Sequence, residues 1–166
     1  VLINNGIHPG EPCGVDASMI LARDLATDKI YAPLLEHVVV CIIPIYNVGG
    51  ALNRNSHSRA NQNGPESYGF RGNARNLDLN RDFIKGDSRN SMTFQKIFSE
   101  WRPDFLIDTH TSNGADYQYV MTYIPTQKDK FTPVLAEYMH QTLNPTLVKS
   151  MFDAQYEMCP YVQGKF

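Results

Sequence analysis

The chain has 166 residues, of which 42% are hydrophobic, and a net charge of −2. This length and composition suit one ordinary globular domain, and the charge gives no reason to expect nucleic acid or an anionic membrane as a partner. No apolar run approaches the roughly 18 residues of a membrane span. The sequence starts inside an apolar run at Val1 and its last residues, from Cys159 on, form no element that we recognise, so we expect it to be incomplete at both ends.

The first half of the sequence alternates between strand and helix patterns. The apolar run 1–3 predicts a short buried strand over residues 1–4. Residues 12–26 have apolar positions at helical spacing and predict a helix, with Glu11 at or just before its first turn, where a carboxylate is favourable. Residues 37–45, rich in Val and Ile, predict a second strand. The polar stretch 47–75 lacks periodicity and is long for a connection, which is typical of a functional loop.

The second half continues the alternation. Residues 94–101 predict a helix, residues 104–108 and 117–124 two strands, and residues 132–143 another helix. This order predicts an α/β fold with a mixed, largely parallel sheet flanked by helices. In such sheets, ligands bind at the carboxyl ends of the strands.

A His and a Glu three residues apart follow the first predicted strand. Pro9 and Gly10 form a tight turn between His8 and Glu11, so that an imidazole and a carboxylate can reach one ion. Two His, one Glu and a water are a recognised catalytic zinc set. The pair alone is common, and a loop histidine beside a helix-capping glutamate would look the same.

The third predicted strand also ends at a histidine. His110 follows Asp108 and Thr109, and small polar residues come after it. Because the carboxyl ends of parallel strands meet at one edge of the sheet, we expect His110 to lie near His8. Alone, His110 could equally be a surface histidine.

Arginines and asparagines gather between these two histidines. Arg75 and Arg81 lie within the segment 73–83, with Arg71 just before it. A planar guanidinium binds a carboxylate through two parallel hydrogen bonds, so this segment suits an anionic group on a substrate. The alternative is a solvated polar loop.

Together these segments resemble the M14 zinc carboxypeptidase family. The matching features occur in the family's order: the pair His8 and Glu11, the segment 44–50 before the substrate loop, the pair Asn80 and Arg81, and His110, which follows Glu11 by 99 residues (110 − 11). The resemblance implies a partial zinc carboxypeptidase-like catalytic domain over residues 1–166, with the phosphorylase/hydrolase-like fold of the family.

The resemblance also implies roles for particular residues. His8, Glu11 and His110 would bind one Zn²⁺, Asp78 would orient His8 from behind, Arg71 would polarise the scissile carbonyl, and Asn80 and Arg81 would grip the C-terminal carboxylate of a peptide. The expected reaction is hydrolysis of C-terminal peptide bonds by a zinc-activated water.

Two further expectations follow from the family. Its general base is a glutamate well downstream of the third ligand, and only 56 residues follow His110 (166 − 110), so we expect the base outside this chain. Neither Glu137 nor Glu157 lies in a context that we recognise. Many proteins of this kind act outside the cytoplasm, so a secreted or periplasmic location is expected.

Two other functions fit part of the pattern. A zinc deacylase of the aspartoacylase or succinylglutamate desuccinylase type shares similar motifs, matched here by the segments 78–81 and 108–111. The segment 43–50 and the long loop after it favour a carboxypeptidase. A non-catalytic peptide-binding module on the same scaffold would keep the carboxylate grip and lose the base.

Overall fold

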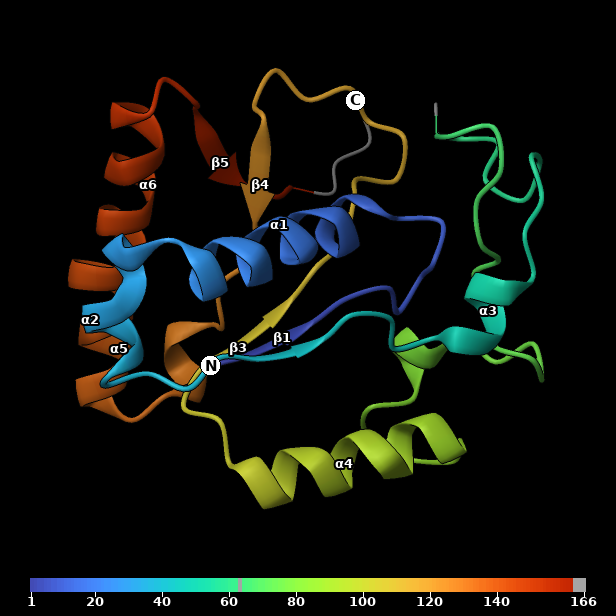
Figure 1. Cartoon of the computed structure of the whole chain (residues 1–166), viewed down its shortest axis with the longest axis horizontal. Coiled ribbons are helices and arrows are strands. Elements are labelled where there is room, and N and C mark those ends of the chain that lie inside the picture. The colour runs from blue at the N-terminus through green and yellow to red at the C-terminus, as the bar shows by residue number, and fades with distance from the viewer. Residues whose placement is uncertain (63, 163–166) are drawn as a thin grey trace. The chain divides into compact units, whose positions relative to one another are not determined.

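The computed structural model describes residues 1–62 and 64–162, which fall into two compact units, Val1–Gly114 and Ala115–Phe166. In the first unit, strands β1 (Leu2–Asn4), β2 (Cys41–Ile43) and β3 (Leu106–Asp108) form a parallel sheet in the order β2-β1-β3 (Figure 1). An isolated bridge between Asn55 and Tyr68 is antiparallel. The parallel sheet β2-β1-β3, with helices beside it, confirms the predicted α/β class.

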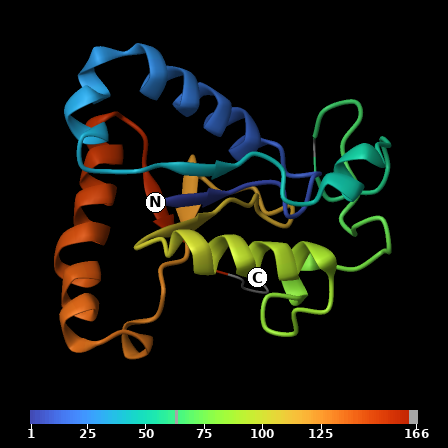
Figure 2. The ribbon, with the colours of Figure 1, turned by 60° about the horizontal axis from the view of Figure 1, so that its bottom comes forward.

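Two helices cover the sheet of the first unit. Figures 1 and 2 show α1 (Cys13–Thr27) and α4 (Arg89–Trp101) on opposite faces of it. Apolar side chains from the sheet, the loops and α4 form the buried core: Leu2, Ile7, Tyr46, Leu79 and Phe94, with Cys41, Ile43 and Phe83 packed against them. This packing fixes the central strand β1, whose three residues are all buried.

Several boundaries in the first unit differ from the sequence predictions. Strand β2 covers three residues rather than 37–45, because its ladder extends only as far as the three residues of β1. Helix α4 starts five residues before the predicted position, because the Ser88 side chain accepts the Ser91 N–H and caps it there. Short helices occur where no element was predicted: a 3₁₀ turn at Lys29–Tyr31, α2 (Ala32–Leu35), and α3 (Val48–Leu52) inside the long loop.

The second unit pairs strand β4 (Met121–Tyr123) with strand β5 (Met158–Pro160) in parallel. Between them lie a 3₁₀ turn at Lys128–Lys130, α5 (Pro133–Tyr138), a π-helical turn at Met139–Leu143 and α6 (Asn144–Asp153).

Two predictions about the second unit were wrong. The helix predicted to end at residue 143 continues, because Pro145 lies at the start of α6, where its missing N–H is tolerated. The last residues do contain an element, β5, which the sequence pattern missed. Within the described part of the chain, no helix is both long and apolar enough to cross a bilayer.

Candidate metal centre

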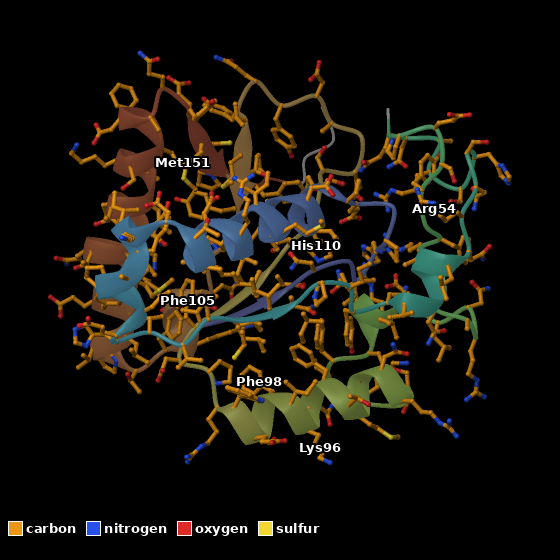
Figure 3. The ribbon with its side chains drawn as sticks, viewed as in Figure 1. Arg54, Lys96, Phe98, Phe105, His110 and Met151 are labelled. Atoms are coloured by element: carbon orange, nitrogen blue, oxygen red, sulfur yellow. The ribbon has the colours of Figure 1, made fainter. Side chains whose placement is uncertain are left out.

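Two neighbouring strands deliver the histidines of this centre. Strands β1 and β3 pair with Asn4 opposite Asp108, so their carboxyl ends lie side by side. His8 follows β1 and His110 follows β3, and both reach the same edge of the sheet, as the strand pattern predicts (His110 is labelled in Figure 3).

The turn after β1 brings Glu11 back toward His8. Gly6 has φ +63°, a conformation that residues with a side chain rarely adopt, and the Glu11 N–H donates to the His8 carbonyl at 2.9 Å. Glu11 therefore lies just before α1, which starts at Cys13, and its side chain is 3% exposed.

Three donor side chains converge at this point. One ligand atom from each of His8, Glu11 and His110 lies within 4.8 Å of the others, so the group could hold a metal ion. His8 Nδ1 is 3.1 Å from Glu11 Oε1, and His110 Nδ1 is 2.9 Å from Glu11 Oε2. Two imidazole nitrogens and a carboxylate are ligands that zinc accepts.

Carboxylates hold the far nitrogens of both histidines. His8 Nε2 lies 3.1 Å from Asp78 Oδ1, and His110 Nε2 lies 3.1 Å from Asp108 Oδ2. Metal-binding histidines commonly have such a partner, which fixes the ring and its tautomer. With both Nε2 atoms engaged, both Nδ1 atoms face Glu11, so these residues fit a zinc ion.

Asp108 was not among the predicted site residues. It lies two residues before His110 at the end of a strand, and side chains two apart in an extended segment share a face. That spacing is a sequence signal that could have identified it.

The site alters the proton affinity of its members. Burial by itself would raise the pKa of Glu11, but hydrogen bonds from His110, His8 and the Thr111 N–H outweigh it and hold that pKa far below its usual value. Burial would lower the pKa of His110, but hydrogen bonds to Asp108 and Glu11 raise it to about 9. Asp108 and Glu11 therefore stabilise the protonated form of His110, and the same contact stabilises the ionised form of Glu11.

Asp78 shows the same balance at the other histidine. Its burial opposes ionisation, and the hydrogen bonds from His8 and Arg71 more than compensate, so the pKa of Asp78 is lowered. Arg71 binds Asp78 Oδ2 through Nε at 3.0 Å and Nη2 at 2.9 Å, and its Nη1 lies 3.4 Å from His8 Nδ1. Arg71 therefore lies directly beside the centre.

A short 3₁₀ helix, Leu79–Arg81, carries the predicted carboxylate-binding pair. Asp78 caps it by accepting the Asn80 N–H at 3.0 Å, and Leu79 is fully buried. Asn80 Nδ2 lies 3.4 Å from His110 Nε2, while Arg81 is exposed and donates to the Asn80 carbonyl at 2.9 Å. The structure thus brings Asn80 to the centre and leaves the Arg81 side chain at the surface.

The long polar loop contributes a residue that sequence reasoning also missed. Arg59 Nη2 lies 3.0 Å from Glu11 Oε1, and the two side chains are 5% and 3% exposed. Nothing in the spacing of this loop distinguishes Arg59 from the other arginines in it.

Comparison with known proteins identifies the family. The Peptidase_M14 family model, described as zinc carboxypeptidase, matches residues 1–100. The chain therefore belongs to the M14 family of zinc carboxypeptidases, and the interpretation as a carboxypeptidase is favoured over a deacylase. The matched region contains all the predicted site residues except His110.

Individual relatives are distant. Carboxypeptidase 2 of Trichophyton rubrum is 28% identical over 111 residues, which cover 66% of this chain and 18% of the fungal protein. Carboxypeptidase 2 of Trichophyton tonsurans is 29% identical with the same coverage. The chain thus spans about a fifth of the length of these curated relatives.

One solved structure shares the fold. A crystal structure from Burkholderia mallei ATCC 23344, of a protein assigned as a carboxypeptidase, superposes with a TM-score of 0.71 at 18% sequence identity. The match covers 99% of this chain and 39% of that one.

Proposed function

We propose that residues 1–166 form part of the catalytic domain of a zinc metallocarboxypeptidase, which hydrolyses the C-terminal peptide bond of a peptide. The observation that carries this proposal is the convergence of two Nδ1 atoms on one carboxylate, with a further carboxylate behind each imidazole. The membership of the M14 family supports it.

His8, Glu11 and His110 are the residues that would hold one zinc ion. Zinc, when bound there, supplies a Lewis acid and lowers the pKa of a coordinated water toward 7. Asp78 and Asp108 keep the two rings oriented by accepting from Nε2. The Thr111 N–H donates to Glu11 Oε2 at 3.0 Å and limits rotation of the carboxylate.

Arg71, Asn80 and Arg81 would bind the substrate. The Arg71 guanidinium lies beside His8, where a permanent positive charge stabilises negative charge that develops on a scissile carbonyl oxygen. Asn80 and Arg81 lie on one short helix next to His110 and would bind the terminal carboxylate. We assign no general base among the described residues.

The test is whether the zinc-loaded protein distinguishes a free carboxylate from its amide. Calorimetry would compare a short peptide that ends in a carboxylate with the same peptide ending in a carboxamide. A charge-assisted hydrogen bond contributes about 1.5–3 kcal/mol, so we expect the acid to bind at least about tenfold more tightly.

Two variants locate this preference. Arg81→Met should abolish the preference for the acid over the amide. Arg75 is an exposed arginine in the same segment, and Arg75→Met should leave the preference unchanged. Equal binding of the acid and the amide to the unaltered protein would contradict the proposed function.

A further inference from the structure

An arginine from the long polar loop contacts Glu11, which is one of the two buried residues of the candidate metal centre. The Arg59 guanidinium and the Glu11 carboxylate form an ion pair at 3.0 Å, with both side chains nearly inaccessible to solvent. Removing two charges from water is unfavourable unless the geometry is good, so a pair of this kind has to be built by the surrounding fold.

The loop is shaped around Arg59. Asn55 and Tyr68 exchange two backbone hydrogen bonds of 3.0 Å, which close the loop at its base. The Tyr68 hydroxyl accepts the Arg59 N–H at 3.2 Å and donates to the Ser56 carbonyl at 3.0 Å. The Arg59 backbone is therefore held on the inner side of the loop.

The turn that carries Glu11 is shaped to admit the same side chain. A Cβ atom at Gly10 would overlap Cδ of Arg59. Any larger residue at position 10 would thus push the guanidinium away from Glu11. The polar loop that carries Arg59 and the turn that carries Gly10 are therefore complementary in shape where they meet.

The contacts of Glu11 divide between its two oxygens. Oε1 contacts Arg59 Nη2 and His8 Nδ1, and Oε2 contacts His110 Nδ1 and the Thr111 N–H. Arg59 and Thr111 therefore hold opposite oxygens of the carboxylate. With both held, the plane of the carboxylate is fixed relative to the two histidines.

We propose that Arg59 is a positioning residue of the metal centre, which fixes the orientation in which Glu11 meets a metal ion. This inference rests on the proposed function, because it requires a metal at His8, Glu11 and His110. The positioning role and the charge of Arg59 predict opposite changes in metal affinity when Arg59 is replaced. A nearby positive charge repels a cation, so removing the charge alone would tighten metal binding. Loss of a positioning partner would weaken it, commonly by about 10- to 100-fold.

The experiment measures zinc affinity by competition with a chromophoric chelator. We expect Arg59→Met to weaken binding roughly 10- to 100-fold and Arg59→Lys, which keeps the charge but loses the planar fork, to weaken it less. The matched control is Arg54→Met. Arg54, which is labelled in Figure 3, is an exposed arginine of the same loop. Its side chain donates to the Ser67 carbonyl. The zinc affinity of Arg54→Met should stay within about twofold of the unaltered protein, since Arg54 does not contact the ligands.

A spectroscopic signature separates positioning from general loosening. The visible absorption of the cobalt-substituted protein reports the ligand geometry, so its bands should shift in Arg59→Met and not in Arg54→Met. Unchanged or tighter zinc binding in a folded Arg59→Met variant would overturn the inference. If that variant does not fold, Arg59→Lys decides, and unchanged affinity there would overturn it. Absence of zinc binding in the unaltered protein would instead overturn the proposed function, and this inference with it.

Discussion

The two compact units differ most in how their side chains are buried. Every buried residue in the described part of the chain lies between positions 2 and 94, within the first unit. In the second unit, large apolar side chains lie at the surface, with Val120 73%, Ile124 75%, Val134 77% and Phe152 66% exposed. The metal centre belongs to the packed unit. The candidate ligands therefore lie in the unit that has a buried central strand, β1, although β3, which precedes His110, is exposed.

The largest difference in stability between the two units should appear when an aromatic ring is removed from each of them. Phe94 is 5% exposed and packs against Tyr46 and Phe83, with ring centroids 5.5 and 5.3 Å away. Phe94→Ala should lower the free energy of unfolding by about 3–5 kcal/mol, because it leaves a cavity in the core. Phe152→Ala in the second unit should lower it by less than about 0.5 kcal/mol. Urea denaturation measures both, and equal losses would contradict the comparison.

Replacement of a glycine in α1 should have a smaller effect on the free energy of unfolding, and it should destabilise where Gly→Ala in a helix usually stabilises. In an open helix, Gly→Ala stabilises by about 1 kcal/mol. A Cβ at Gly14 would overlap the Thr109 side chain, which lies next to His110 and donates to Asn5 Oδ1 at 2.8 Å. We therefore expect Gly14→Ala to lower the free energy of unfolding by about 1–3 kcal/mol. An increase in the thermal stability of Gly14→Ala would show that α1 does not pack tightly against Thr109.

The helix caps give the smallest contrast between the units. Ser88 accepts the Ser91 N–H at 3.0 Å and caps α4, whereas Thr132 at the start of α5 makes no such hydrogen bond. Ser88→Ala should lower the free energy of unfolding by about 1 kcal/mol. Thr132→Ala should change it by no more than about 0.5 kcal/mol. Similar losses in the two variants, measured by urea denaturation, would remove this distinction.

The order of elements could be read from the sequence because hydrophobic periodicity is a local signal. The apolar run at 1–3 and the helical spacing at 12–26 predicted the first strand and the first helix nearly to the residue. The second strand was predicted too long, because the limit on its ladder is set by the length of β1, which lies far away in sequence. Boundaries set by a partner are not visible in a local pattern.

The convergence of the three candidate ligands could be expected, because two of them follow strand ends and the family resemblance pairs the third with His8; that they bind a metal stays a prediction. The side chains that hold them were predictable only in part. Asp78 was expected from the resemblance, and Asp108 could have been found from its spacing to His110. Arg59 could not, because its contact with Glu11 depends on the path of a long loop without periodicity. The secreted or periplasmic location stays a prediction.

The most direct test of the central claim is the zinc content of the purified chain, measured by elemental analysis. We predict about one zinc per chain in the unaltered protein and none in the His8→Ala, His110→Ala double variant, because two of the three ligands are lost. The control is His37→Ala, His140→Ala, which removes two exposed histidines outside the centre and should keep the metal. A folded, unaltered protein without zinc, or equal loss of zinc in the control, would contradict the assignment of His8, Glu11 and His110 as the metal centre.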